Sequence, residues 1–302
     1  MGLKKGETAL VVCDKPLRKI GRILFEKAAE LEFDAIFLEM IPLKMHGEEP
    51  PSLVAEAMKS SDVVVVPTST SLSLTAARRQ ACDAGARIAT LPTITEDIMK
   101  RAIPADYSKI KERSIRVANV LSQTNAARVT TESGTDITLS LEGRKALADF
   151  GIYHKKGDFG NLPAGEACIA PVEGTSSGVI VVDGAIAGIG KMDSPCMITV
   201  EKGIVKNIEN CPELEKILDK YGESARCIAE LGVGTNDKAK VIGNVLEDEK
   251  VMGTVHIALG NNIAFGGVID VPVHLDCIIL DPTLEVEGGD IIDKGRYVYD
   301  LD

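Results

Sequence analysis

Apolar stretches alternate with amphipathic stretches through the first hundred residues of the chain. Four short stretches are almost entirely apolar, which is typical of strands buried on both faces: 8–13, 35–38, 62–66 and 87–91. Between them, apolar residues recur at helical spacing over 18–31, 53–58 and 74–84. Buried strands alternating with helices predict a parallel sheet covered on both faces, and therefore an open α/β domain.

The pattern changes after residue 122. Short β-rich segments separated by Gly, Asp and Asn follow: 128–131, 136–139, 178–182 and 197–200. One helix is marked by Pro212 in its first turn and ends at Gly222. We therefore expect an α/β protein with two domains: an open parallel-sheet α/β domain over 1–122 and a mainly β (α+β) domain over 123–302.

Composition narrows the class of protein. The net charge of -11 excludes a nucleic-acid binder, because binding a phosphate backbone needs clustered Lys and Arg. No apolar run reaches the ~18 residues that cross a bilayer, and the start of the chain lacks a signal-peptide pattern. The seven cysteines are odd in number and irregularly spaced, which indicates free thiols in a reducing compartment. We expect a cytoplasmic protein.

Two histidines lie in strand-like segments near the end of the chain, over 253–260 and 273–280. In an extended strand, residues i and i+2 point to one face, so His274 and Asp276 can present an imidazole and a carboxylate side by side. With His256 they form a ligand set that suits a divalent metal.

Acidic and hydroxyl side chains supply further candidates. Glu166 and Glu230 each stand beside a glycine-rich turn, where they are either ligands or ordinary surface residues. Ser69 and Ser71 lie in a loop after the third predicted strand, where substrates often bind in α/β sheets. The same loop has a second interpretation, as the N-cap of the following helix.

Four segments occur here in the order seen in another family: 161–166, 230–232, 256–260 and 274–276. Together they resemble the aminopeptidase T/aminopeptidase S-type metallopeptidases, also called thermophilic or leucyl aminopeptidases, of which this chain would be a divergent short member. Segments 67–75 and 84–92 extend the resemblance. It implies five metal ligands, namely Glu166, Glu230, His256, His274 and Asp276. It also implies Zn, Co or Mn as the metal, and we expect a homodimer that acts on a peptide or small molecule.

Two positions depart from that family. Ile263 stands where the peptidases carry a Tyr thought to assist catalysis, and Leu74 stands where relatives commonly carry a His. A related branch cleaves hydroxylated pyridine rings with a single iron held by two His and one Asp. His256, His274 and Asp276 would supply that set as well.

Three functions follow from this resemblance. The leading hypothesis is a metallo-aminopeptidase, a hydrolase in which two ions activate water and Glu166 and Glu230 take part in catalysis. The second is a mononuclear Fe(II) ring-cleaving dioxygenase of the 2,5-dihydroxypyridine type. The third is a metal-binding relative without catalytic activity.

Overall fold

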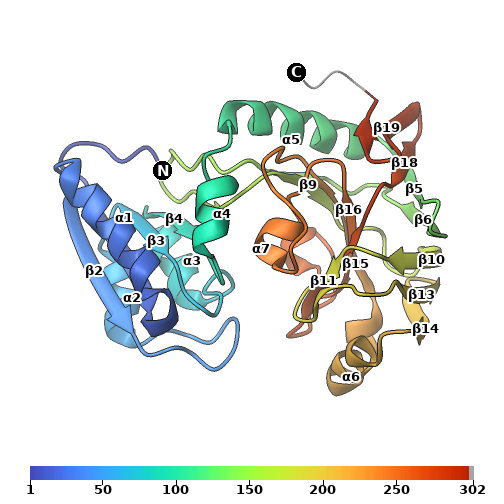
Figure 1. The fold of residues 1–302 in the computed structure, drawn as a ribbon, viewed down its shortest axis with the longest axis horizontal. Coiled ribbons are helices and arrows are strands. Elements are labelled where there is room, and N and C mark those ends of the chain that lie inside the picture. The colour runs from blue at the N-terminus through green and yellow to red at the C-terminus, as the bar shows by residue number, and fades with distance from the viewer. Residues whose placement is uncertain (299–302) are drawn as a thin grey trace. The chain divides into compact units, whose positions relative to one another are not determined.

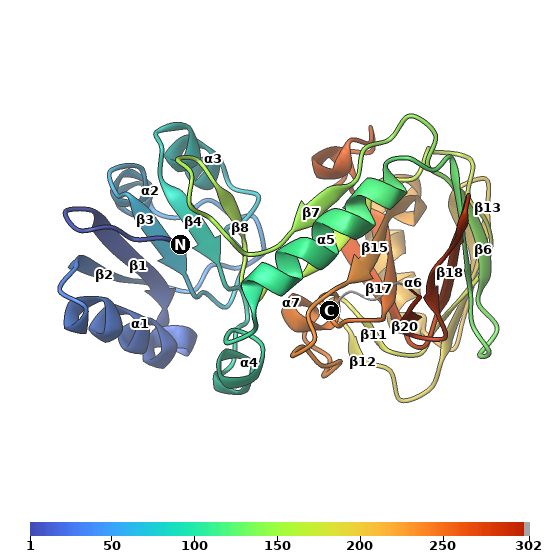
Figure 2. The same ribbon diagram turned by 90° about the horizontal axis from the view of Figure 1, so that it is seen from above.

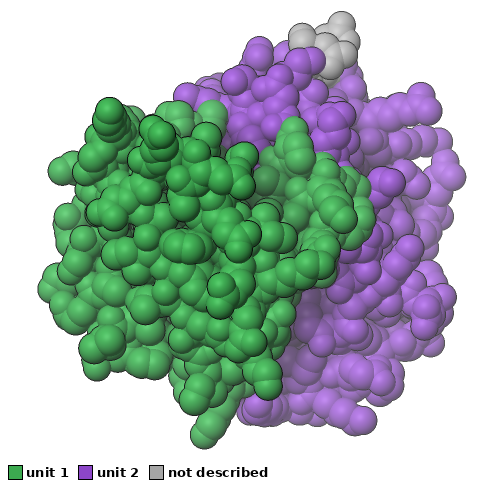
Figure 3. Space-filling view, turned by 60° about the vertical axis from the view of Figure 1, so that its left-hand side comes forward, with its two compact units in different colours: residues 1–104, 151–164 green, residues 105–150, 165–302 purple. Residues whose placement is uncertain are grey.

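The computed structural model describes residues 1–298 and divides into two compact units (Figure 3). Unit 1 consists of residues 1–104 and 151–164, and unit 2 of residues 105–150 and 165–302. The sequence predicted a single break after residue 122. The units are instead discontinuous, because a short strand from the middle of the chain joins the sheet of unit 1.

Unit 1 is built on a parallel sheet in the order β2-β1-β3-β4-β8. Its strands are β1 (Thr8–Asp14), β2 (Asp34–Met40), β3 (Val63–Val66), β4 (Arg87–Thr90) and β8 (Phe159–Asn161). Helix α1 (Arg18–Glu30) covers one face, and α2 (Ser52–Lys59) and α3 (Ala76–Asp83) cover the other (Figure 2). Helix α4 (Glu96–Arg101) follows β4. The predicted open α/β architecture is therefore confirmed.

Unit 2 contains two antiparallel sheets among the described residues (Figures 1 and 2). The eight-stranded sheet has the order β14-β13-β10-β6-β5-β18-β19-β20. Its strands are β5 (Ala126–Thr130), β6 (Asp136–Ser140), β10 (Ser177–Val182), β13 (Cys196–Glu201), β14 (Ile204–Glu209), β18 (Thr283–Val286), β19 (Gly289–Asp293) and β20 (Arg296–Tyr297). The mainly β character predicted for the second half of the chain is confirmed.

The seven-stranded sheet carries the candidate site and has the order β12-β11-β17-β16-β15-β9-β7. Its strands are β7 (Leu147–Asp149), β9 (Glu166–Ile169), β11 (Ala185–Ile186), β12 (Gly190–Lys191), β15 (Ile228–Gly234), β16 (Val255–Gly260) and β17 (His274–Ile279). Helix α5 (Tyr107–Leu121) packs against β7 and β9. Unit 2 also contains α6 (Pro212–Tyr221) and the short α7 (Val245–Asp248).

The hydrophobic core of unit 2 lies between these two sheets and fixes which way the strands of the seven-stranded sheet face. Leu231 and Val233 of β15, Ile257 of β16, and Leu275 and Cys277 of β17 all belong to this core. Because side chains alternate along a strand, their neighbours in sequence must point to the opposite face. That opposite face holds the candidate site.

None of the helices within residues 1–298 combines the length and the apolar composition that a membrane crossing requires.

Candidate metal centre

The five side chains proposed from sequence start from four adjacent strands. Glu166 opens β9, Glu230 lies in β15, His256 in β16, and His274 and Asp276 in β17. Strand registers bring them together, since Ala258 of β16 stands between Glu230 on one side and Asp276 on the other. Positions spread over more than a hundred residues of sequence thus converge on one face of one sheet.

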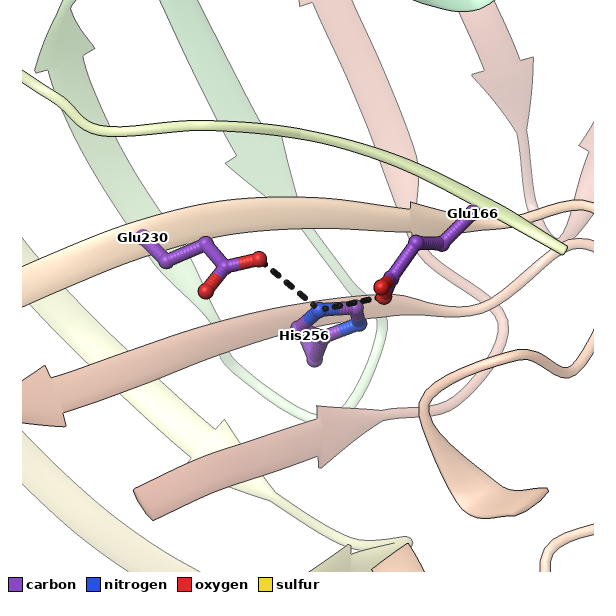
Figure 4. Close-up of side chains that lie close together, drawn as sticks. All are labelled: Glu166, Glu230 and His256. Atoms are coloured by element: carbon purple, nitrogen blue, oxygen red, sulfur yellow. Dashed lines mark ion pairs between the residues drawn. The ribbon is translucent and has the colours of Figure 1, made fainter. Parts of the chain in front are cut away.

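Two overlapping clusters result, and Glu230 belongs to both. In the first, His256 Nε2 lies 3.5 Å from Glu166 Oε2 and 3.7 Å from Glu230 Oε1, so the imidazole stands between two carboxylates (Figure 4). In the second, His274 Nε2 lies 3.0 Å from Glu230 Oε2 and 3.3 Å from Asp276 Oδ1. Either cluster offers three donor atoms close enough to share one ion.

A glycine makes room for His256. Gly232 stands opposite His256 in the ladder between β15 and β16. A Cβ atom at Gly232 would lie 1.9 Å from His256 Nε2, so the imidazole lies directly over the glycine backbone. In the sequence this glycine ends the segment 230–232, and its spacing of two residues from Glu230 indicates that both face the site.

A buried lysine, which the sequence analysis missed, neutralises part of the acidic charge. Lys250 is fully buried, and its Nζ lies 2.5 Å from Glu166 Oε1, 2.7 Å from Glu249 Oε1 and 3.7 Å from Asp149 Oδ2. Burial alone would lower the pKa of Lys250, but Glu166, Glu249 and Asp149 raise it well above its usual value. Lys250 therefore stays charged and holds Glu166 by one oxygen.

Without a metal ion, the imidazoles and the carboxylates shift one another's pKa values strongly. Burial alone would lower the pKa of His256, but the surrounding carboxylates of Glu230, Asp276 and Glu166 raise it to about 9. Burial alone would raise the pKa of Glu230, but His256 and His274 lower it to about 2. The site therefore favours positive charge, which a divalent cation supplies when it displaces protons from the imidazoles.

Unsatisfied polar atoms show that the site fits a metal ion. Among the described residues, both ring nitrogens of His256 and Glu166 Oε2 are buried without a hydrogen-bond partner. Unpaired buried polar atoms are costly, and coordination of a cation removes that cost. His274 is better held, since its Nδ1 lies 2.7 Å from the carbonyl oxygen of Asn261. An outer contact of this kind commonly orients a metal-binding histidine.

The two serines proposed to bind substrate lie in unit 1 and make internal hydrogen bonds. The backbone N–H of Ser69 donates to Asp14 Oδ2 at 2.7 Å, and its hydroxyl donates to the same oxygen. The Ser71 hydroxyl donates to that of Ser73 at 2.9 Å. Helix α3 is instead capped by Thr75, whose Oγ1 accepts from the backbone N–H of Arg78 at 3.1 Å. Substrate binding by Ser69 and Ser71 remains a prediction.

Comparison with known proteins identifies the family. No curated protein sequence matches the chain. A family model described as NicX, 2,5-dihydroxypyridine 5,6-dioxygenase, matches residues 3–299. The chain belongs to the 2,5-dihydroxypyridine 5,6-dioxygenase family.

Two solved structures are similar to this member of the dioxygenase family. One is the 2,5-dihydroxypyridine dioxygenase from Pseudomonas putida KT2440, with a TM-score of 0.82, 18% identity, and coverage of 98% of this chain and 93% of that one. The other is wild-type AmpT from Thermus thermophilus, with a TM-score of 0.70, 18% identity, and coverage of 98% and 95%. At this identity both show a shared fold.

The prediction of a peptidase is wrong, and so is its assignment as a hydrolase and protease. The dioxygenase family model covers nearly the whole chain, and an oxygenase is an oxidoreductase. The error arose because the resemblance rested on segments around the metal ligands, which fit both chemistries. Ile263 agrees with the correction, since its half-exposed side chain has no group that can donate or accept a proton.

Proposed function

We propose that the protein is a mononuclear Fe(II) dioxygenase that opens a hydroxylated nitrogen-containing aromatic ring. The family match over residues 3–299 carries this proposal. The donor set supports it, because two imidazoles and a carboxylate are the ligands that ring-cleaving and related non-haem iron enzymes use. His256 of the first cluster, together with His274 and Asp276 of the second, would hold the iron.

When bound, iron would bring O₂ and the ring together and relay electrons from the ring to O₂, so that the ring itself is the reductant. With 2,5-dihydroxypyridine as the substrate, the atoms balance as follows. The bond between ring carbons 5 and 6 breaks, and each of these carbons gains one oxygen atom of O₂. No further reductant is consumed. A proton must leave a ring hydroxyl for the ring to become electron-rich, and the protein must accept it.

We propose that Glu166 accepts this proton from the ring hydroxyl. Its Oε1 is held by Lys250 at 2.5 Å, whereas its Oε2 has no hydrogen-bond partner and faces His256. The lysine fixes the carboxylate through Oε1, and Oε2, which faces the site, would be the oxygen that accepts the proton. Glu230, which lies between both histidines, would hold the two imidazoles in place through charge.

The test starts from protein reconstituted anaerobically with ferrous iron. We expect one iron per chain, oxygen uptake with 2,5-dihydroxypyridine or a related hydroxypyridine, and both atoms of ¹⁸O₂ in the product by mass spectrometry. A His256→Ala variant is the matched control and should bind no iron.

Three results would contradict the proposal. Two zinc ions per chain, or a product that contains only one labelled oxygen atom, would exclude a mononuclear dioxygenase. Stable iron without oxygen uptake across a panel of hydroxylated pyridines would favour the non-catalytic relative.

A further inference from the structure

A long loop joins the two strands that carry the histidines. It runs over residues 261–273 between β16 and β17, and we call it the β16–β17 loop. A short 3₁₀ helix, η3 (Ile263–Phe265), lies within it. His274 is the first residue of β17, directly after the loop, so the end of the loop sets the position of the His274 side chain.

The loop contacts His274 in two ways. The carbonyl oxygen of Asn261 lies 2.7 Å from His274 Nδ1, which fixes the rotation of the ring and leaves Nε2 toward Glu230. The ring of Phe265 stacks on the imidazole, with 5.2 Å between centroids and 27° between planes. A displacement of the loop would therefore move an iron ligand and also the aromatic side chain that covers it.

Packing holds only the second half of the loop in place. Val271 belongs to the core of unit 2, and Ile269 and Val273 pack against it. Ile263 is 50% exposed and Val268 is 71% exposed, so the first half depends more on hydrogen bonds. Asn262 is fully buried, its Oδ1 accepts from the backbone N–H of Ile269 at 2.7 Å, and its Nδ2 donates to Glu173 Oε1 at 2.9 Å.

Glu173 and Arg144 anchor the loop from neighbouring segments of unit 2. The same oxygen, Glu173 Oε1, also accepts the backbone N–H of Val268 at 2.9 Å. Arg144 forms an ion pair with Glu173 Oε2 and donates a second hydrogen bond to the carbonyl oxygen of Gly266. The side chains of Arg144 and Glu173 are 16% and 22% exposed, so solvent screens this pair less than an ion pair on the open surface.

We propose that Arg144 and Glu173 are positioning residues for the metal centre, acting on His274 through the β16–β17 loop. Neither is itself a proposed ligand of the iron. Together they fix Asn262, Gly266 and Val268 in the loop, and the loop in turn fixes the Nδ1 contact of His274 and the position of Phe265. This inference rests on the proposed metal site and adds residues outside it.

The experiment compares cobalt binding by wild type, Glu173→Ala and Glu173→Gln, because bound Co²⁺ reports its ligand geometry in its visible spectrum. We expect Glu173→Ala to weaken Co²⁺ binding by about tenfold or more and to change that spectrum, as loss of an outer contact of a metal ligand typically does. Glu173→Gln should recover most of the affinity, because its amide oxygen still accepts both hydrogen bonds of Glu173 Oε1.

Glu215→Ala is the matched control. It removes one of the two carboxylates that pair with Arg226, whose side chain is 17% exposed, and neither Glu215 nor Arg226 belongs to the loop. It should leave Co²⁺ affinity and spectrum unchanged. With iron, Glu173→Ala should also raise KM for the ring substrate, because Phe265 is displaced, while Glu215→Ala should not.

The outcomes separate this inference from the proposed function. Wild type that binds neither cobalt nor iron would refute the metal centre itself. Wild-type affinity and spectrum in folded Glu173→Ala would overturn the positioning role and leave the metal centre standing. If Glu173→Ala fails to fold, Arg144→Lys decides, since one ammonium cannot reproduce both guanidinium contacts; unchanged cobalt binding there would also overturn the inference.

Discussion

Replacing Gly232 by alanine tests whether the sheet positions His256. The new Cβ would lie 1.9 Å from His256 Nε2 and 2.2 Å from Cε1. Non-bonded atoms make favourable contact at about 3.5 Å, so the imidazole would have to move by roughly 1.6 Å. Displacing a catalytic group by ~1 Å can cost about a hundredfold in rate, and overpacking of this kind costs ~1–3 kcal/mol of stability.

We expect Gly232→Ala to fold but to lose most of its metal and its oxygen uptake, as measured by elemental analysis and an oxygen electrode. Gly21→Ala is the control, because its Cβ would press on Cys13 at 2.9 Å in unit 1, away from any ligand. That variant should lose some stability and keep its metal. Wild-type metal affinity in Gly232→Ala would refute the claim that this glycine makes room for the ligand.

Three further results are expected. Asp276→Ala should lose bound metal by elemental analysis, whereas Ile263→Ala should retain it; equal metal contents would contradict the ligand assignment. Lys250→Met should lower the free energy of unfolding in urea by ~3–5 kcal/mol, because it leaves Glu166 buried and uncompensated. Burial raises the pKa of Asp248 from 3.8 to about 6, so wild type should lose stability as pH rises across that interval. Asp248→Asn should therefore raise the melting temperature above pH 6 and leave it unchanged below pH 4. A difference below pH 4 would argue against the buried carboxylate as the cause.

Much of unit 1 follows from local pattern. The apolar runs that became β1, β3 and β4 are continuous because both faces of a parallel sheet are buried. β8 could not be predicted in the same way. It has three residues, Phe159, Gly160 and Asn161, and only its pairing with β4 makes it a strand.

The residues that supply the donor atoms of the site could also be predicted from the sequence. The buried charge that lies beside them could not. Spacing of two residues placed His274 and Asp276 on one face. Lys250 lies in an acidic run over 247–250 that looks like a solvated surface, yet tertiary contacts bury it. The chemistry itself was misassigned because the same ligands serve both a hydrolase and an oxygenase.

The late strand β8 has a consequence for how the protein is made. β4 ends at residue 90, but the strand that covers its open edge is complete only at Asn161, after residues 105–150 of the other unit have been synthesised. A nascent chain in between exposes unpaired backbone groups along β4, and such edges recruit other chains. A gene fragment that stops at residue 104 would encode the same open edge, so an autonomous unit 1 would have to carry residues 151–164 with it.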